Sequence, residues 1–428
     1  MMQKTHFAGI SLKELAETYG TPLILYDELQ VRSRIQSIQE VLRATGIRYH
    51  LAYACKAFCT RAMVELAAEE HIGLDVVSGG ELYTAISANF PGERIHFNGN
   101  NKSLSELMLA VEYGVGLIII DQFQEIHHLV QVLKRFPGKR QRVLLRITPG
   151  VHADTHHYIQ TGQEDSKFGF DLESGQVHQA IDAVLAYPEL ELVGLHMHIG
   201  SQITSADGYL AAVNRLLERV HTFPAFSFNI LNLGGGMGIA HTPDEVEPDL
   251  PALFHLIVTG VKDLFASFAF ALPELWFEPG RSIVGPAGAT LYTVGSIKDV
   301  PGIRTFAAVD GGMSDNIRPA LYGARYTAHY VGQSSEPIHR YTIVGKLCES
   351  GDVLIDDVEL PRLKDGDRIL IPATGAYTYA MASHYNRLPR PAVVFVRDGE
   401  ARLVVRRETY DDVVRNDLPL HSSLQSNV

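Results

Sequence analysis

The chain has 428 residues, of which 46% are hydrophobic and 20% charged, and its net charge is −12 at pH 7. Such a composition is typical of a globular protein with a large core, and the acidic balance argues against nucleic acid or an anionic membrane as partner. The three cysteines, Cys55, Cys59 and Cys348, are too few for a disulfide framework, and no Cys/His cluster has zinc-site spacing. We therefore expect a cytoplasmic protein without a metal site. Because no apolar run approaches about 18 residues, we expect no membrane span.

Between about residues 35 and 280, short apolar runs alternate with amphipathic stretches. Strands are predicted at residues 49–54, 74–77, 95–97, 117–120, 142–147, 192–198, 230–233 and 275–277. Helices are predicted at residues 60–70, 80–88, 103–112, 122–134, 175–186 and 205–222. This alternation predicts a parallel (β/α)8 barrel of TIM type, in which the carboxyl ends of the strands meet at one face and carry the chemistry.

The pattern changes after residue 285, where glycine and proline separate short β-rich runs. Strands are predicted there at residues 289–297, 305–309, 340–344, 368–371, 392–397 and 400–406. Because helical periodicity is sparse, we predict an all-β domain of sandwich or barrel type. The predicted domains are the barrel at residues 35–284 and the β domain at residues 285–428. Residues 1–34, with a strand candidate at 22–26, are expected to join the β domain.

Lys56 stands in the run YACKAF, at the end of the first predicted barrel strand. Taken alone, the hexapeptide best fits a strand-edge lysine whose ammonium reaches solvent. Inside a fold, desolvation would lower the pKa of the amine, and a neutral amine can form a Schiff base with the aldehyde of pyridoxal phosphate (PLP). Such a cofactor also needs a phosphate cradle, a partner for its ring nitrogen and a group against its ring. The rest of the chain offers a candidate for each.

Two glycine-containing motifs each follow a predicted strand. LNLGGGMGI places Gly234, Gly235 and Gly236 at a turn, where backbone N–H groups can approach a phosphate, although three glycines can equally mark only a tight turn. HMHIGSQ ends another strand with His198 and Ser201. A histidine there can lie flat on an aromatic cofactor while the serine donates to phosphate; a core histidine is the simpler alternative.

Glu278 in FEPGRSIVGPAG ends an otherwise apolar strand and is expected to point at the barrel mouth. A carboxylate in that place can keep a pyridine nitrogen protonated, so that the ring absorbs electrons released at the substrate α-carbon. The alternative is a surface ion pair between Glu278 and Arg281 at a turn.

The predicted β domain contributes further candidates, each weak alone. In GKLCESGDVL, Cys348 could reprotonate a carbanion, since an unperturbed thiol has a pKa of about 8.5, or it could be a small buried hydrophobe. Its neighbour Glu349 could meet a substrate ammonium or a structural arginine. Arg318 and Tyr322 in DNIRPALYG, and Tyr377 in TGAYTYAMASHYNRLPRP, could hold a substrate, because arginine captures carboxylates well.

Together these motifs closely resemble the fold-type III PLP-dependent decarboxylases, and within them the diaminopimelate decarboxylases. The resemblance covers nearly the whole chain, in family order: YACKAF, LDVVSGGEL, ERIHFNGNNKS, TGQEDSKFGF, HMHIGSQ, LNLGGGMGI, EPGR, RPALYGA, CESGD and YNRLPRP. CES with TGQEDSKFGF separates the chain from the related ornithine and arginine decarboxylases. Cys55, Ser314 and His384 depart from the family pattern, and of these His384 could alter substrate contacts.

The resemblance implies a PLP-binding barrel of alanine racemase type and a set of site residues. The catalytic residues would be Lys56 holding PLP, His198 on its ring, Glu278 at its ring nitrogen and Cys348 as the acid. The cofactor-binding residues would be Lys56, Asp75, His198, Ser201, Gly234, Gly235, Gly236, Glu278, Pro279, Gly280, Arg281 and Tyr377. The substrate-binding residues would be Arg281, Arg318, Tyr322, Glu349 and Tyr377. Asp75 and Glu81 match acidic positions near the lysine in relatives.

The resemblance also implies a reaction and an assembly. The chain would decarboxylate meso-2,6-diaminopimelate at its D-configured centre to L-lysine, as a homodimer in which Cys348 and Glu349 serve the neighbouring subunit's cofactor. The alternatives are another fold-type III decarboxylase, acting on carboxynorspermidine or a carrier-bound amino acid, and an inactive homologue that binds a partner protein. A racemase fits less well, because the family resemblance places an arginine at the ring nitrogen in racemases of this fold, where this chain would have the carboxylate of Glu278.

Overall fold

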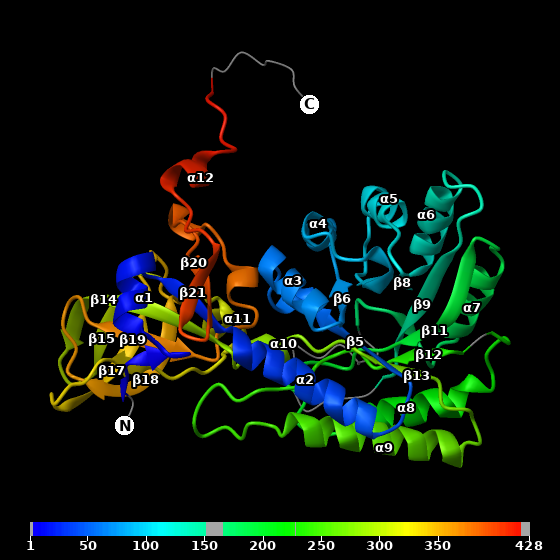
Figure 1. Cartoon of the computed structure of the whole chain (residues 1–428), viewed down its shortest axis with the longest axis horizontal. Coiled ribbons are helices and arrows are strands. Elements are labelled where there is room, and N and C mark those ends of the chain that lie inside the picture. The colour runs from blue at the N-terminus through cyan, green and yellow to red at the C-terminus, as the bar shows by residue number, and fades with distance from the viewer. Residues whose placement is uncertain (1–2, 151–165, 227, 421–428) are drawn as a thin grey trace. The chain divides into compact units, whose positions relative to one another are not determined.

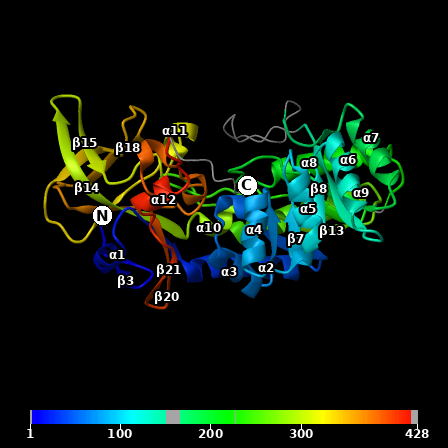
Figure 2. The ribbon, with the colours of Figure 1, turned by 90° about the horizontal axis from the view of Figure 1, so that it is seen from above.

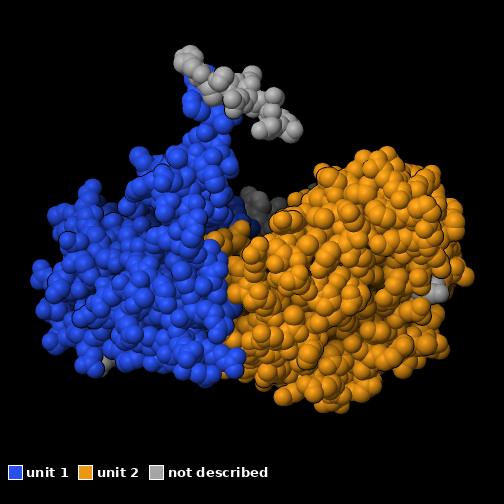
Figure 3. All heavy atoms as spheres, turned by 45° about the horizontal axis from the view of Figure 1, so that its top comes forward, with its two compact units in different colours: residues 1–27, 289–374, 381–428 blue, residues 28–288, 375–380 orange. Residues whose placement is uncertain are grey.

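The structure is a computed structural model that describes residues 3–150, 166–226 and 228–420. The chain forms two compact units, which Figure 3 shows in different colours. The barrel unit contains Glu28–Gly288 and Gly375–Ala380, and the β unit contains Met1–Asp27, Ala289–Thr374 and Met381–Val428. Each unit is therefore assembled from segments that are far apart in the sequence.

Eight parallel strands form the barrel. They are β5 (Tyr49–Ala54), β6 (Gly73–Val76), β7 (Ile95–Phe97), β8 (Leu117–Ile120), β9 (Gln141–Thr148), β11 (Leu190–His196), β12 (Ile230–Asn232) and β13 (Glu274–Phe277). The ring closes where β13 pairs with β5 and β8 pairs with β9, and the short β10 (Phe170–Asp171) pairs with the end of β9. The predicted (β/α)8 barrel is confirmed, and each predicted strand end lies within two residues of the observed one.

Helices cover the outside of the barrel. They are α2 (Glu28–Ala44), α3 (Arg61–Glu69), α4 (Gly79–Ser87), α5 (Leu104–Tyr113), α6 (Phe123–Leu133), α7 (Gln176–Leu185), α8 (Asp207–Val220) and α9 (Leu250–Ser267). Neighbours from α3 to α7 pack side by side, and α9 packs against both α8 and α2 (Figures 1 and 2). Polar caps fix where helices begin: Ser103 and Glu106 form a reciprocal capping box at α5, and Thr60 accepts a hydrogen bond from the third residue of α3.

Helix α9 is long and apolar enough to cross a membrane by length and composition, with a mean hydropathy of 1.3. In the structure it packs against the neighbouring helices of the barrel. Its buried residues include Leu253, Ile257 and Val261, which recur every fourth position and therefore share one face. This is the pattern of a helix that covers a core. The sequence prediction did not include α2 or α9.

The β unit is built on one ten-stranded sheet. Its strands are β1 (Gln3–Lys4), β4 (Leu23–Asp27), β14 (Gly288–Val300), β15 (Arg304–Val309), β16 (His329–Val331), β17 (Ile338–Val344), β18 (Val353–Pro361), β19 (Arg368–Pro372), β20 (Ala392–Arg397) and β21 (Glu400–Val405). In β14, Ala289 and Leu291 face one hydrophobic cluster while Tyr292 and Val294 face another. Both faces of the sheet are thus covered, and the predicted second domain of mostly β structure is confirmed.

Short helices accompany this sheet. They are α1 (Leu12–Tyr19), α11 (Arg318–Tyr322) and α12 (Tyr410–Val414). Strand β4, which ends the N-terminal segment of the β unit, pairs with both β14 and β20 and is therefore an integral part of the sheet. The burial of all but the last residue of β4 explains why the sequence there is almost entirely apolar.

Candidate active site

The interior of the barrel is packed below its mouth. Trp276 stacks on His96 with ring centroids 4.5 Å apart, and its centroid also lies 4.5 Å from that of His50. Apolar side chains complete this layer: Leu117, Ile119, Leu144, Val193 and Ile230. Because side chains of a strand point the same way every second residue, the next inward position of each strand lies nearer the carboxyl-end face. At that position the strands carry the buried polar residues Asp75, Asn98, Asp121, Arg146, His196, Asn232 and Glu278.

A cavity of about 280 Å³ lies at this polar layer. Its lining residues are Lys56, Asp75, Val77, Asn98, Gly99, Asn100, Arg146, Phe168, His196, His198, Gly235 and Glu278. The structure thus brings together five of the residues predicted from the sequence, namely Lys56, Asp75, His198, Gly235 and Glu278. A concave site with convergent ionisable groups at this face of a barrel is the candidate active site.

Lys56 lies in a single 3-10 turn, Cys55–Ala57, directly after β5. The backbone of this turn is fixed on both sides: the last residue of β5 donates to the carbonyl of Pro279 at 3.2 Å, and the N–H of Tyr377 donates to the last carbonyl of the turn at 2.9 Å. An added Cβ on Gly280 would lie 2.9 Å from a backbone oxygen of β5, so only glycine allows this approach. Tyr377 has a φ of 58°, a strained value that persists where the surroundings enforce it.

Glu278 is buried, and three side chains contact its carboxylate. His196 Nε2 lies 3.0 Å from Oε2, the amide nitrogen of Asn232 donates to Oε1 at 2.6 Å, and His96 Nδ1 lies 3.4 Å from Oε1. Burial opposes the charge, but His196 and His96 outweigh it and hold the pKa of Glu278 well below its usual range. The pKa of Asp75 is raised instead, by burial and then by the charge of Glu278. The environment therefore separates the two carboxyl groups, and Glu278 carries the charge.

The turn after β12 contains the three consecutive glycines. Gly234 has a φ of 68° and Gly236 a φ of 110°, and an added Cβ would lie 2.6 Å and 2.4 Å, respectively, from a backbone oxygen. Side chains cannot be accommodated at these two positions. The N–H of Gly234 donates to Oδ1 of Asn232 at 2.8 Å, and the N–H of Gly235 donates to Nδ1 of His198 at 3.3 Å. The sequence motif thus forms a tight turn whose backbone is directed by two side chains of the site.

His198, Ser201, Arg281 and Tyr377 lie around this glycine turn. Burial, reinforced by the charges of Lys56 and Arg146, keeps the pKa of His198 well below its usual range, so its ring is neutral. Arg281 begins the short helix α10 (Arg281–Val284); its Nη2 donates to Oγ of Ser201 at 3.1 Å, and its guanidinium lies 4.6 Å from the centre of the Tyr377 ring. Arg281 is buried, as is Glu278, which does not fit the alternative of a surface ion pair.

Two predicted substrate-binding residues, Arg318 and Tyr322, lie on α11 of the β unit. Arg318 is buried, and its Nη1 donates to the hydroxyl of Tyr326 at 3.0 Å. Tyr322 is half-buried at the end of the helix. The β unit therefore presents a fixed arginine, held by a phenol, and a partly accessible tyrosine one helical turn further on.

Cys348 and Glu349 lie in the turn between β17 and β18 and are exposed. The turn is built on the carboxylate of Asp352, which accepts the N–H of Leu347 at 2.9 Å. The backbone N–H of Cys348 donates to Oδ1 of Asn386 at 2.7 Å. Within this chain the thiol of Cys348 therefore reaches solvent, and the alternative of a small buried hydrophobe is wrong.

Two of the three residues that depart from the family pattern, His384 and Ser314, have polar partners. His384 Nε2 lies 2.5 Å from Oε2 of Glu408, which also pairs with Arg390 at 2.6 Å. Despite partial burial, these partners lower the pKa of Glu408 to about 2. The hydroxyl of Ser314 donates to Oδ1 of Asp315 at 3.2 Å. His384 thus belongs to an ion-pair cluster of the β unit. In the TGQEDSKFGF motif, residues 161–165 lie outside the described residues.

The sequence prediction missed five buried residues of the polar layer in the barrel: Asn98, Asp121, Arg146, His196 and Asn232. Arg146 is buried, its guanidinium lies 4.2 Å from the centre of the Phe168 ring, and its Nη1 lies 3.6 Å from Oδ2 of Asp121. Four of the missed residues, Asn98, Asp121, Arg146 and Asn232, lie near a strand's carboxyl end and two positions beyond a residue of the packed layer. His196 lies three positions beyond Val193, because β11 has a register shift there. The period of two, continued to the last inward position of each strand, is the signal that could have found them.

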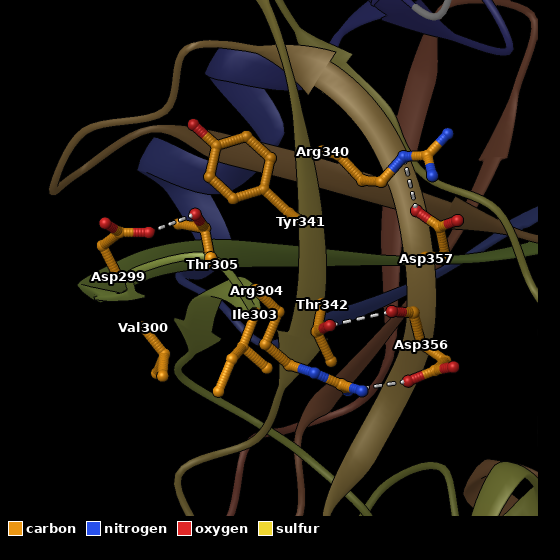
Figure 4. Close-up of a pocket in the computed structure, with 11 residues that line it drawn as sticks. Asp299, Val300, Ile303, Arg304, Thr305, Arg340, Tyr341, Thr342, Asp356 and Asp357 are labelled. Carbon is orange, nitrogen blue, oxygen red and sulfur yellow. Dashed lines mark hydrogen bonds and ion pairs between the residues drawn. The ribbon is translucent and has the colours of Figure 1, made fainter.

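A second cavity, of about 430 Å³, lies in the β unit and is lined by residues of β14, β15, β17 and β18 (Figure 4). Its arginines pair with carboxylates of its own wall: Arg304 Nη1 lies 3.0 Å from Asp356 Oδ1, and Arg340 Nε lies 3.3 Å from Asp357 Oδ1. These ion pairs are exposed to solvent and therefore contribute little to the stability of the protein. Because the predicted site residues lie elsewhere, we place the active site in the barrel cavity.

The comparisons with known proteins agree on one family. The family model described as "Pyridoxal-dependent decarboxylase, pyridoxal binding domain" matches residues 28–285, so the chain belongs to the pyridoxal-dependent decarboxylases. Over nearly its full length it is similar to proteins named diaminopimelate decarboxylase. The Bacillus subtilis protein is 51% identical over 97% of this chain and 96% of its own, and the Halalkalibacterium halodurans protein is 48% identical over 96% and 94%.

The similarity extends to solved structures. A diaminopimelate decarboxylase from M. jannaschii, in complex with L-lysine, matches with a TM-score of 0.89 at 34% identity. The match covers 96% of this chain and 95% of the M. jannaschii chain. Both the barrel and the β unit therefore belong to the shared architecture.

The residues of the barrel cavity fit pyridoxal phosphate, the cofactor of this family. Lys56 supplies an amine, the ionised Glu278 supplies an acceptor for a protonated ring nitrogen, and the neutral His198 supplies a flat ring. The glycine turn brings the backbone in where any side chain would collide with it, which is the form of a phosphate cradle. The N–H groups of Gly234 and Gly235 are engaged by Asn232 and His198, so the turn and these two side chains form one unit. Arg281, held by Ser201, adds a buried positive charge next to it.

Proposed function

We propose that the chain decarboxylates the D-configured centre of meso-2,6-diaminopimelate to L-lysine and carbon dioxide, the last step of lysine biosynthesis. The observation that supports this type of reaction is that Lys56 and the buried, ionised Glu278 line the same cavity. The substrate rests on the full-length similarity to diaminopimelate decarboxylases. This similarity favours diaminopimelate over the carboxynorspermidine, carrier-bound and inactive alternatives.

When bound, pyridoxal phosphate supplies a protonated pyridine ring that accepts the electron pair left on the substrate α-carbon as carbon dioxide departs. Three residues of the cavity prepare for this chemistry. Lys56 would hold the cofactor covalently through its amine. Glu278 would retain the proton at the ring nitrogen, because it stays ionised although buried. His198 would lie against the ring as a neutral imidazole.

We divide the remaining predicted residues between the cofactor and the substrate. The residues proposed to surround the cofactor and its phosphate are Asp75, Ser201, Gly234, Gly235, Gly236, Pro279, Gly280, Arg281 and Tyr377. The residues proposed to hold the substrate are Arg281, Arg318, Tyr322, Glu349 and Tyr377. The distal end of the substrate carries an amine and a carboxylate, and arginines together with Glu349 complement that zwitterion.

The substrate is tested by measuring carbon dioxide release from purified protein supplied with pyridoxal phosphate. The substrates are meso-diaminopimelate, its LL isomer, lysine, ornithine and arginine. We expect release from meso-diaminopimelate at least about 100-fold faster than from the others, because a site that pairs buried polar groups with the substrate rejects analogues that leave them unpaired. Faster release from ornithine or arginine would contradict the proposal. A protein that binds no cofactor and releases no carbon dioxide would favour the inactive alternative.

We further propose a homodimer in which each active site uses residues of both subunits. In this arrangement Cys348 of one subunit protonates the α-carbon in the site of Lys56 of its partner, and Glu349 holds the substrate there. Support comes from the exposure of Cys348 and Glu349 in a turn whose backbone is rigidly held by Asp352. An exposed thiol on a fixed turn is accessible to a second copy of the chain. A two-fold interface would form two equal sites.

Mixing two inactive variants tests this arrangement. Lys56→Ala and Cys348→Ala chains, mixed under conditions where subunits exchange, should regain activity. In a random mixture about half the dimers are heterodimers with one intact site each, so about one quarter of wild-type activity per site is expected. As the matched control, Lys56→Ala mixed with Glu278→Gln should regain none, because both residues belong to the same barrel. Absence of recovery in the first mixture, with exchange verified by mass spectrometry, would contradict the shared site.

We place this reaction in the cytoplasm. Cys55, Cys59 and Cys348 are all free, and Cys348 is exposed, which suits a reducing compartment. Fractionation of the source cells, followed by detection of the protein with an antibody, checks the location. Recovery in a secreted or envelope fraction would contradict it.

A further inference from the structure

The carboxylate of Glu278 has three polar side chains of the barrel around it, in addition to any cofactor that it would face. His196, on β11, contacts one of its oxygens at 3.0 Å, and Asn232, on β12, donates to the other at 2.6 Å. His96, on β7, adds a contact of 3.4 Å to the second oxygen and is itself stacked on Trp276. The contacts thus come from three different strands, and all three side chains are buried.

His196 and Asn232 each make a hydrogen bond to the carboxylate, whereas His96 Nδ1 makes only a longer polar contact of 3.4 Å. An ionised carboxylate offers about four lone-pair sites, so these two hydrogen bonds leave room for a further donor. Glu278 lines the cavity, so a donor there can take that place. Among the described residues Nδ1 of His196 has no hydrogen-bond partner, whereas Nε2 lies 3.0 Å from Glu278 and 3.4 Å from the amide nitrogen of Asn98. The shorter contact fits a neutral ring that carries its proton on Nε2 and donates it to Glu278.

We propose that His196, with Asn232 and His96, is a positioning residue that keeps Glu278 ionised and thereby sets the protonation of the cofactor's ring nitrogen. The inference rests on the proposed function, in which Glu278 faces that nitrogen. None of the three residues needs to touch the cofactor for this effect. Each donor stabilises the charged form of Glu278 and so opposes transfer of the ring proton onto its carboxylate.

Asn232 also connects this cluster to the glycine turn. Its amide nitrogen donates to Glu278, while its carbonyl oxygen accepts the N–H of Gly234 at 2.8 Å. One side chain therefore fixes the carboxylate proposed for the ring nitrogen and the backbone proposed for the phosphate. Substitution of Asn232 would disturb both, so His196 is the better residue to test.

Other ionisable groups surround Glu278 and must be considered in any pH dependence. They are Lys56, Asp75, His50, Asp121, Arg146 and His198. Burial keeps the pKa of His50 at about 3 and lowers that of His198, so both rings stay neutral above pH 6. Burial lowers the pKa of His196 despite the opposing effect of Glu278, which favours the neutral ring. Its contribution is therefore a hydrogen bond.

The experiment compares His196→Leu with His196→Gln in the holoenzyme, loaded with pyridoxal phosphate carrying ¹⁵N at the ring. Leucine removes the donor, whereas the amide of glutamine can place a donor near the position of Nε2. The ¹⁵N chemical shift reports ring protonation directly and is followed from pH 6 to pH 9. In the wild type we expect a protonated ring nitrogen. In His196→Leu we expect the ratio of the protonated to the unprotonated form to fall about ten- to hundredfold, because one hydrogen bond to a charged group is lost. His196→Gln should restore most of the wild-type signal.

A matched control is His50→Leu. His50 is also a barrel histidine against Trp276, but in the described part of the chain no hydrogen bond joins its ring to Glu278. It should leave the ¹⁵N titration unchanged. In His196→Leu, kcat should fall by about the same factor as ring protonation while KM changes little, because the substrate contacts are intact.

Two results would overturn the inference in different ways. A wild-type ring nitrogen unprotonated throughout the range would overturn both this inference and the proposed role of Glu278. A protonated wild type with an identical titration in His196→Leu would overturn this inference alone. Should His196→Leu not fold, His96→Phe serves instead, since its ring can remain stacked on Trp276. It should shift the titration in the same direction, and an unchanged titration there would likewise overturn the proposal.

Discussion

Lys56→Ala is expected to lower decarboxylation by about 10³-fold or more, because it removes the amine that would hold the cofactor. The turn that carries Lys56 is fixed by backbone hydrogen bonds to Pro279 and Tyr377, which do not involve the lysine side chain. The variant should therefore fold and melt like the wild type. It should also lack the absorbance of lysine-bound cofactor, while free pyridoxal phosphate still binds weakly at the cavity.

Borohydride reduction provides the direct measurement. In the wild type it should fix the cofactor on Lys56, and because a modified lysine resists trypsin, the label should appear on a peptide of residues 49–61, between Arg48 and Arg61. Lys134→Ala, which changes an exposed lysine at the end of α6, is the control and should retain both label and activity. Recovery of the label on Lys102 or Lys167 would contradict the assignment.

The barrel could be predicted from the sequence because its strands are short, apolar and separated by helical patterns. The strand at residues 49–54 was predicted with the bounds it has in the structure. Strand β18 was missed for a physical reason: Asp356, Asp357 and Glu359 are exposed on it and break its apolar pattern. An edge strand of a sheet tolerates such charges, and a sequence pattern cannot distinguish it from a loop.

The site was predictable to the extent that its chemistry is local in the sequence. Lys56, Glu278 and the glycine turn each stand directly after an apolar strand, so the topology of a barrel alone assembles them. His196 and Asn232 contact Glu278 across 82 and 46 residues of sequence, and nothing near either residue indicates this partner. A barrel predicts that β11, β12 and β13 are neighbours, but which of their polar side chains meet depends on strand register and side-chain direction, and these are known only from the structure.

Glu278→Gln is expected to slow decarboxylation by about 10²–10³-fold, the loss typical of removing one electrostatic group that acts in the transition state. Glutamine keeps the shape: its oxygen can accept from Asn232, and its amide can donate to His196 once that ring moves its proton to Nδ1. Pyridoxal phosphate should therefore still bind, with its affinity changed only a few-fold. What is lost is the negative charge that retains a proton on the ring nitrogen, and with it the capacity to take up the electron pair of the α-carbon.

Stopped-flow absorbance separates the steps of this variant: substrate binding should keep its wild-type rate, while carbon dioxide release becomes slow enough to limit kcat. Glu274→Gln is the matched control on the same strand, since Glu274 lies at the opposite end of β13 and accepts a hydrogen bond from Trp276 Nε1 at 2.9 Å. It should decarboxylate like the wild type. Near-normal turnover of Glu278→Gln would mean that the buried carboxylate only supports the packing of His196 and Asn232. Burying a charge costs free energy, and groups buried in this way are concentrated at functional sites. We therefore expect the turnover of Glu278→Gln to be strongly reduced.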